Sequence, residues 1–260
     1  MPDSIENLKK VSDAFSVDTF FIPIIGAEIE FYLKGSIPDN ILELIEPELT
    51  SQNIPYLDVK KEKGNGQFEV SIKHTDNPVK IANYLSYTKE IITKLALQSN
   101  LSADFSAKPH ENDYGNAMHI HLSLKDKNGN NPMAKNDDDE SDIMLYAIGG
   151  LLKNMPNSMP IFAPTENCKK RFIPGMDAPV TISWGGNNRT VALRLPTTTL
   201  EPYNRRIEHR VASSSADPYK VIAAILASVS EGILNKTLPL SDKIYGDASQ
   251  DQYKLPKLLP

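Results

Sequence analysis

The 260-residue sequence has a single cysteine, no long apolar run and no excess of basic residues. Cys168 cannot form a disulfide within the chain, and residues 1–20 lack the apolar stretch of a secretory signal, so we expect a cytoplasmic protein. The longest wholly apolar run, around residues 221–227, is far shorter than the roughly 20 residues of a membrane-spanning helix. With 28 Lys+Arg against 33 Asp+Glu, the net charge of -5 offers no basic surface. We therefore expect no nucleic-acid or membrane partner.

The common motifs for phosphate binding and covalent hydrolysis are also missing. Neither G-x-x-x-x-G-K-[ST] nor a G-x-G-x-x-G that follows a strand occurs. There is no nucleophile elbow, and the only cysteine is isolated. A nucleotide would instead depend on arginines and metal-bridged phosphates. Candidate arginines lie within one stretch of the sequence, at Arg171, Arg189, Arg194, Arg206 and Arg210.

Hydrophobic periodicity predicts an α+β fold. Apolar residues at helical spacing predict helices over residues 3–15, 38–49, 78–98, 142–154 and 217–234. Strand character predicts strands over residues 20–33, 67–73, 117–124, 179–184, 190–195 and 206–211. We expect one large curved, mostly antiparallel sheet with helices on its outer face. The acidic run Asp137–Asp142 is predicted to be a solvated loop that places negative charge at the start of the next helix.

Two segments contain paired acids. Glu28 and Glu30 are two residues apart in a predicted strand, so their carboxylates share one face. Glu62 and Glu69 flank a glycine-containing loop. Like charges on one face repel unless a cation lies between them, and Mg²⁺ and Mn²⁺ prefer oxygen ligands. Taken alone, the first segment is better explained by a solvated strand face and the second by an ordinary glycine turn.

Two further strands carry polar side chains on one face. In the first, alternation places three side chains together: His119, His121 and Ser123. The histidines are candidates for metal ligands, phosphate donors or a hydrogen-bonded surface. In the second strand the shared face carries Arg206, Glu208 and Arg210. A salt-bridged strand face is the alternative there.

Six motifs, taken in order, resemble the catalytic domain of the glutamine synthetase family over about residues 20–235. They are Gly26-Ala-Glu-Ile-Glu-Phe31, Gly64-Asn-Gly-Gln-Phe-Glu69, Ala117-Met-His-Ile-His-Leu-Ser123, Lys170-Arg-Phe-Ile-Pro-Gly-Met-Asp-Ala-Pro-Val180, Ser183-Trp-Gly-Gly-Asn-Asn-Arg189 and Arg206-Ile-Glu-His-Arg210 with Ala216-Asp-Pro-Tyr219. The amino-acid sequence of residues 206–219 resembles that of the γ-glutamyl-polyamine synthetase branch.

The resemblance implies ATP-dependent ligation of glutamate with ammonia through γ-glutamyl phosphate. The implied cofactors are ATP and two or more Mg²⁺ or Mn²⁺ ions per site. Two alternatives stay open: ligation of glutamate to a polyamine or other amine, and a non-catalytic relative that binds nucleotide and metal or needs a partner chain.

The resemblance also assigns roles to individual residues. It gives one metal the ligands Glu30, Glu62 and Glu69, and the metal that bridges the ATP phosphates the ligands Glu28, His119 and Glu208. The implied catalytic residues are Asp177, Arg189 and Arg210; the implied substrate-binding residues are Gly115, Arg171, Arg189 and Arg210. The implied ATP contacts are His121, Ser123, Arg194 and Arg206. On this basis we expect Glu208→Gln to weaken binding of the nucleotide-associated metal and to abolish γ-phosphate transfer, with little change in folding.

The sequence departs from the family pattern in four places. Residues 1–260 are expected to form a single truncated catalytic domain, without the small β-grasp domain and with a shortened C-terminal region. Asp177 stands where the family has a flap glutamate, and Tyr114 replaces an asparagine. The resemblance therefore leads us to expect an oligomer, or a partner chain that completes the site.

Overall fold

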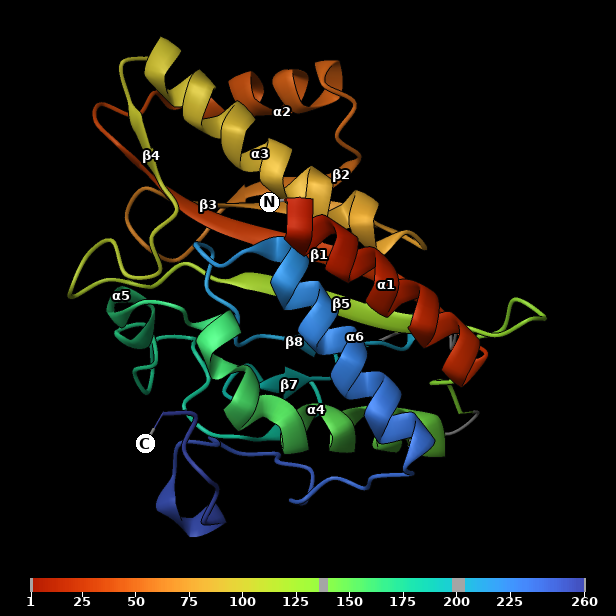
Figure 1. Ribbon diagram of the computed structural model, residues 1–260. Helices are drawn as coiled ribbons and strands as arrows, with labels where there is room; N and C mark the ends of the chain where they lie inside the picture. Colours follow the sequence, from red (N-terminus) through yellow and green to blue (C-terminus); the bar gives the residue numbers. More distant parts are fainter. Residues whose placement is uncertain (1, 136–139, 198–203, 260) are drawn as a thin grey trace.

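One mixed sheet, with a layer of helices on one side, forms the molecule (Figure 1). The computed structural model describes residues 2–135, 140–197 and 204–259. The elements are α1 (Pro2–Thr19), β1 (Ile22–Lys34), α2 (Ile41–Ser51), β2 (Tyr56–Lys61), β3 (Gln67–Thr75), α3 (Pro78–Gln98), β4 (Ser102–Asp104), β5 (Met118–Lys125), α4 (Asp142–Phe162), α5 (Glu166–Lys169), β6 (Trp184–Gly185), β7 (Leu193–Arg194), β8 (Ile207–His209), α6 (Pro218–Leu234) and a 3₁₀ turn, η2 (Asp251–Tyr253).

The sheet has the strand order β2-β3-β1-β5-β8-β7-β6, and β4 also pairs with β1. In the described chain, β6–β7 is the parallel pair and the other named pairs are antiparallel. The predicted α+β architecture is therefore confirmed. The long strand β1 lies near the centre of the sheet, so its side chains are flanked on both sides by neighbouring strands.

Alternation along β1 separates the core from the open face of the sheet. Ile29 and Phe31 are fully buried among the other core side chains. Glu28 and Glu30 point to the opposite face because successive strand residues alternate. The same holds in β5, where Met118 is buried in the core. The predicted faces of both strands are confirmed.

Helix α3 begins where the sequence supplies a cap. The Asn77 side chain accepts the Lys80 N–H at the start of α3, and Pro78 occupies the first turn.

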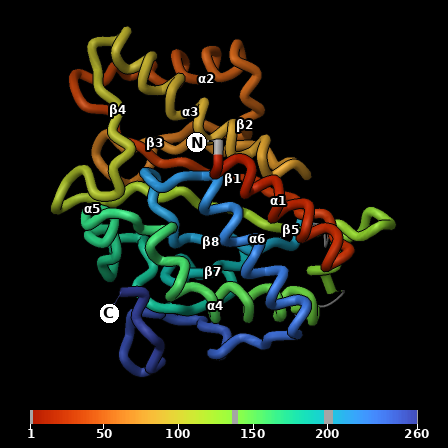
Figure 2. The backbone as a smooth tube through the Cα atoms, in the orientation of Figure 1, coloured from red at the N-terminus to blue at the C-terminus, as the bar shows by residue number. Residues whose placement is uncertain are grey.

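Helix α6 packs against both α1 and α4 (Figure 2). The α4–α6 contact requires glycine, since a Cβ on Gly232 would lie 2.2 Å from the Tyr146 carbonyl oxygen.

Several predicted boundaries are wrong. Helix α4 continues past residue 154 to Phe162, and its last two turns bury Met155 and Met159. Within 179–184 and 190–195, strand structure is confined to β6 and β7. Segment 206–211 is strand only over β8. Elements β2, β4 and α5 had no counterpart in the prediction.

Residues 180–182 hydrogen-bond to the C-terminal segment instead of a neighbouring strand. Ile182 N–H donates to the Pro256 carbonyl at 2.8 Å, and Leu258 N–H donates to the Val180 carbonyl at 3.0 Å. These partners lie far along the chain, and the alternation within 179–184 carries no information about them. The segment is therefore an extended loop.

The acidic run is only partly visible. Residues 137–139 lie outside the described ranges, so the predicted loop is not tested there. Asp142 lies in the first turn of α4, and the Ser141 side chain caps that helix by accepting the Met144 N–H. Among the helices of the described ranges, none combines the length and apolar character needed to cross a membrane.

Candidate active site

Cross-strand pairing assembles polar side chains on the open face of the sheet. Residues directly opposite each other on antiparallel strands have neighbouring side chains. Such pairs include Glu28–His119, Glu30–Glu69, His121–Glu208 and Arg194–Glu208. The register of β3, β1, β5, β8 and β7 therefore gathers residues that are far apart in the sequence.

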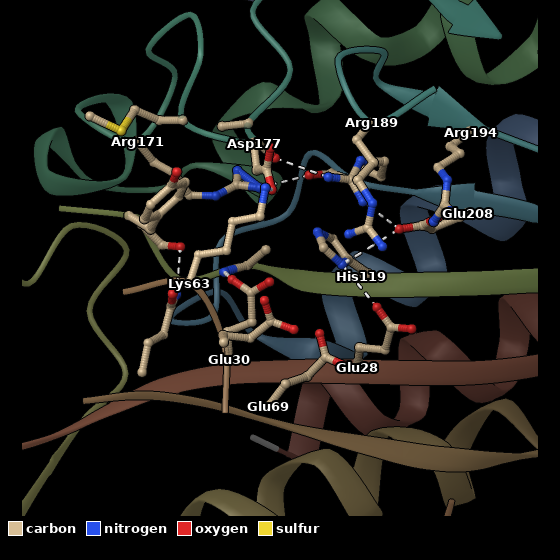
Figure 3. Close-up of a pocket in the computed structure, with 18 of the residues that line it drawn as sticks. Glu28, Glu30, Lys63, Glu69, His119, Arg171, Asp177, Arg189, Arg194 and Glu208 are labelled. Atoms are coloured by element: carbon tan, nitrogen blue, oxygen red, sulfur yellow. Dashed lines mark hydrogen bonds and ion pairs between the residues drawn. The ribbon is translucent and has the colours of Figure 1, made fainter. Parts of the chain in front are cut away.

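A pocket on this face contains most of the predicted site residues (Figure 3). Its lining includes Glu28, Glu30, Glu62, Glu69, Gly115, His119, Arg171, Asp177, Arg189, Arg194, Glu208 and Arg210. The other three predicted residues, His121, Ser123 and Arg206, line a neighbouring groove. The pocket is small, about 60 Å³, whereas the groove is about 1150 Å³. Glu28 lines both, so the two spaces meet at its carboxylate.

Glu28 is held between two histidines. Its Oε2 lies 3.0 Å from His119 Nδ1, and its Oε1 lies 3.0 Å from His121 Nε2. Arg206 Nε donates to His121 Nδ1 at 3.2 Å, so a neutral His121 carries its proton on Nε2 and donates it to Glu28. Burial alone would raise the pKa of Glu28, but the hydrogen bonds from the two histidines lower it overall. Glu28 is therefore a carboxylate that stays ionised.

Glu208 is a buried carboxylate with two arginine partners. Its Oε1 lies 2.5 Å from Arg210 Nη1, and its Oε2 lies 2.6 Å from Arg194 Nη1. The side chains of Glu208 and Arg210 are 1% and 2% exposed. Burial acts to raise the pKa of Glu208, but the charge of Arg210 outweighs it and brings the value to about 2. Arg194, predicted on the nucleotide side, thus lies in the smaller pocket beside Glu208.

The carboxylates on the β3 side of the pocket have less cationic charge around them. Burial, with the neighbouring Glu69 charge, raises the pKa of Glu30 to about 8, although Glu30 Oε2 accepts the Ala117 N–H at 2.7 Å. Burial also raises the pKa of Glu69. Lys60 Nζ lies 2.9 Å from Glu69 Oε1 and 3.3 Å from Glu62 Oε1. Carboxylates that resist ionisation in this way suit a divalent cation.

The donor atoms are close enough to share metal ions. Two trios have ligand atoms within 4.8 Å of one another: Glu28–Glu69–His119 and Glu28–His121–Glu208. Glu28 belongs to both trios. Carboxylate oxygens with one imidazole nitrogen are a suitable donor set for Mg²⁺ or Mn²⁺. These trios recombine members of the two predicted ligand sets and add His121.

Arg171 and Gly115 form one tightly packed unit. The Arg171 side chain is buried, and its Nη1 and Nη2 donate to the carbonyls of Val211 and Arg210 at 3.2 and 2.7 Å. Burial lowers the pKa of Arg171 to about 10. A Cβ on Gly115 would lie 2.6 Å from both Arg171 Cγ and the Ala107 carbonyl oxygen. Only glycine fits at position 115, and the Arg171 guanidinium is anchored to the backbone at the edge of the pocket.

Asp177 and Arg189 lie across the pocket from the carboxylates of β1 and β3 (Figure 3). Asp177 adopts a left-handed backbone conformation with φ 52°, and its carbonyl accepts Arg210 Nη2 at 2.9 Å. Its carboxylate forms an ion pair with Lys63. The loop between α5 and β6 therefore brings an acid to the pocket, and the loop between β6 and β7 brings an arginine.

The site prediction did not include several lining residues that the structure adds, among them Lys60, Lys63 and Gln67. Gln67 lies inside the Gly-Asn-Gly-Gln-Phe-Glu motif, and its Nε2 donates to the Gly115 carbonyl at 3.0 Å. The two lysines flank Glu62 in the sequence Lys60-Lys-Glu-Lys63. Their closeness in sequence to Glu62, a predicted metal ligand, is the feature from which the two lysines could have been predicted.

Comparisons with known proteins identify the family of the chain. The profile of the family described as "Glutamine synthetase, catalytic domain" matches residues 35–258. The γ-glutamylputrescine synthetase PuuA of Escherichia coli is 36% identical over 213 residues, covering 82% of this chain and 44% of that protein. Glutamine synthetase of Pyrococcus horikoshii is 37% identical over 239 residues, covering 84% of this chain and 53% of that protein. The chain thus spans about half the length of these curated relatives.

Solved structures share the fold. The structure titled "GmaS/ADP complex" superposes with a TM-score of 0.86 at 24% identity, covering 99% of this chain and 65% of that one. Plasmodium falciparum glutamine synthetase gives a TM-score of 0.83 at 23% identity, covering 92% of this chain and 57% of that one. Together with the matched profile and the relatives, this shows that the chain belongs to the glutamine synthetase family, through its catalytic domain.

Proposed function

We propose that the chain catalyses ATP-dependent ligation of the γ-carboxylate of glutamate to ammonia or another amine. The observation that carries the proposal is that an acidic pocket, lined also by His119 and by arginines, shares Glu28 with a neighbouring groove of about 1150 Å³. Ligand sites that hold drug-sized molecules are commonly about 300–1000 Å³, so the groove has room for a nucleotide. Its lining includes the predicted ATP contacts His121, Ser123 and Arg206.

The residues around Glu28 would hold divalent cations, through Glu28–Glu69–His119 and Glu28–His121–Glu208. When bound, such cations neutralise phosphate charge during phosphoryl transfer. The fit rests on the raised pKa of Glu30, to about 8 by burial, and on the crowding of carboxylates beside it. A further prediction from the resemblance is that Glu30 and Glu62 join this ligand set.

Phosphoryl transfer would take place between the groove and the arginines. The γ-carboxylate of glutamate attacks the γ-phosphorus of ATP, the bond to the bridging oxygen breaks, and ADP leaves with that electron pair. Arg189 and Arg210 line the pocket where they would stabilise the negative charge of the transferring group. Arg171 and Gly115 would position the glutamate at the edge of the pocket.

The second step transfers the acyl group to the amine. The nitrogen attacks the acyl carbon of γ-glutamyl phosphate, the C–O bond breaks, and inorganic phosphate leaves. The nitrogen must lose a proton, and Asp177, at the mouth of the pocket, is the proposed base. Burial of the acyl phosphate under this loop would limit its hydrolysis by water.

The acceptor has two candidates because the relatives carry both names. One similar protein is named γ-glutamylputrescine synthetase, and others at comparable identity are named glutamine synthetase. Ammonia is the leading acceptor, and a polyamine is the second. Comparing glutamate-dependent ADP release with ammonium and with putrescine separates them, because a clear preference for putrescine contradicts the first.

The central test is γ-glutamyl hydroxamate formation by the purified chain with ATP, glutamate, Mg²⁺ and hydroxylamine. Hydroxylamine captures the acyl phosphate without a dedicated ammonium site. Omission of glutamate is the background control, and Glu231→Gln, at an exposed pair with Lys153, is the variant control. Binding of ATP and Mg²⁺ without hydroxamate would favour the non-catalytic or partner-completed alternative. Light scattering of the same sample tests the expected oligomer, and cytoplasmic location stays a prediction.

A further inference from the structure

An ion pair between two loops crosses the mouth of the pocket. Lys63 belongs to the loop between β2 and β3, and Asp177 belongs to the loop between α5 and β6. The ammonium of Lys63 contacts the carboxylate of Asp177, and both residues line the pocket (Figure 3). Their side chains are 52% and 33% exposed, so the pair lies at the solvent edge of the site.

Asp177 differs from the buried carboxylate of Glu208 in the kind of cation with which it is paired. Glu208 is paired with the buried guanidinium of Arg210, which cannot move away without disrupting the core. Asp177 is paired with a half-exposed lysine on a flexible stem. Its own backbone is fixed, because its carbonyl accepts a hydrogen bond from Arg210. Lys63 can therefore leave while the Asp177 carboxylate stays in place.

A lysine side chain is an alkylammonium ion, the same chemical class as a protonated acceptor amine. We infer that Lys63 is a specificity-determining residue: its ammonium occupies the cation position at Asp177 and competes there with the cationic acceptor. The inference rests on the proposed function, which brings the amine to Asp177. In this paired position Lys63 Nζ also lies 5.7 Å from the centroid of the Tyr114 ring.

The size of the effect follows from the exposure of the pair. A half-exposed ion pair is populated only a few-fold over its open form. Removing a competitor of that strength raises the apparent affinity for a cation at Asp177 by about two- to sixfold. A neutral acceptor does not compete for this charge, so its affinity does not change.

Binding of n-butylammonium to the full chain tests the inference without turnover. Ligand-observed NMR is expected to show that Lys63→Gln binds this probe about two- to sixfold more tightly than wild type. Lys63→Arg keeps the charge, and Lys61→Gln removes the same charge from an exposed lysine of β2; both should match wild type. Adding Asp177→Asn to Lys63→Gln should abolish the gain. Equal or weaker binding by Lys63→Gln, or no binding by any variant, overturns the inference.

Kinetics separate this inference from the proposed function. In Lys63→Gln the KM for the cationic acceptor should fall by the same factor, with the KM for glutamate and for largely uncharged hydroxylamine unchanged. A fall for hydroxylamine as well would contradict competition between cations. Absence of hydroxamate in wild type would refute the proposed function, while the binding measurement would still decide the role of Lys63.

Discussion

Replacing Glu208 by glutamine tests whether the site also holds the sheet together. The carboxylate receives Arg210 Nη1 at 2.5 Å and Arg194 Nη1 at 2.6 Å, and it lies 3.6 Å from His119 Nδ1. Glutamine keeps the shape but has no charge, and its amide NH₂ must face one of the two guanidinium groups. The variant therefore leaves the buried charge of Arg210 uncompensated.

Two arguments give a similar magnitude for the stability that Glu208→Gln should lose. Moving the pKa of Glu208 from 4.5 to about 2 corresponds to about 3 kcal/mol in favour of the ionised native form. Removing one member of a buried ion pair costs about 3–5 kcal/mol in other proteins. We expect the free energy of unfolding to fall by about 3 kcal/mol at neutral pH. The sequence-based expectation was little change in folding. Because of these ion pairs, the structure leads us to expect a marked loss of stability instead.

The pH dependence has a definite sign. A depressed carboxyl pKa stabilises the native state above the unfolded value, and this stabilisation is lost as the pH falls through the native value. The difference between wild type and Glu208→Gln should therefore be constant near neutrality and shrink as the pH falls from 4.5 towards about 2. A difference that grows on acidification would contradict the ion-pair explanation.

Urea denaturation followed by the fluorescence of the single tryptophan, Trp184, measures the loss. Trp184 is 5% exposed and reports on the sheet edge near Arg194. The matched control is Glu231→Gln, whose exposed partner Lys153 makes its expected cost below about 1 kcal/mol. A cost below about 1 kcal/mol for Glu208→Gln as well would refute the reasoning. Mn²⁺ titration of the same variant should show weaker binding, because a ligand charge is gone.

Three further predictions concern charge and packing. Lys60→Met removes the ammonium that lies 2.9 Å from the Glu69 carboxylate, so the affinity for Mn²⁺ measured by calorimetry should rise about fivefold. Weaker Mn²⁺ binding would mean that Lys60 orients the carboxylate instead. Burial raises the pKa of Glu30 to about 8, so the metal-free chain should lose stability, on the order of a few kcal/mol, between about pH 5 and about pH 8. Differential scanning fluorimetry should show this loss of stability, and Mg²⁺ should reverse it. Gly232→Ala should lower the free energy of unfolding by about 1–3 kcal/mol in urea denaturation. Gly186→Ala, whose Cβ would lie 3.7 Å from Lys243 Cε, should be nearly neutral, and equal costs would contradict the packing argument.

Local periodicity was enough to predict the elements that carry their own signals. Helix α3 begins at Pro78 and ends at Gln98 as predicted, because a capping Asn77, a proline in the first turn and an apolar stripe all lie within it. The faces of β1 and β5 were predictable because alternation is a property of the strand itself. The candidate site followed from these faces together with the motifs.

Pairing between distant segments was not predictable from periodicity. Nothing within β1 indicates that Glu28 lies opposite His119 and that Glu30 lies opposite Glu69. The edge strand β2 was missed because its polar sequence, Tyr56–Lys61, shows little alternation. Lys60 lies opposite Glu69 only through the β2–β3 register, so its contact with the site depended on that missed strand.

The site is built from charges that oppose folding unless each has a partner. Burial acts to raise the pKa of Glu28, Glu30, Glu69 and Glu208. Glu28 and Glu208 are offset by histidine and arginine within the chain, whereas Glu30 and Glu69 remain partly uncompensated. A cation that binds the native state alone stabilises it by mass action. The carboxylates that weaken the metal-free sheet are therefore the ones through which a bound divalent cation would strengthen it, so metal affinity and stability should change together across variants of this face.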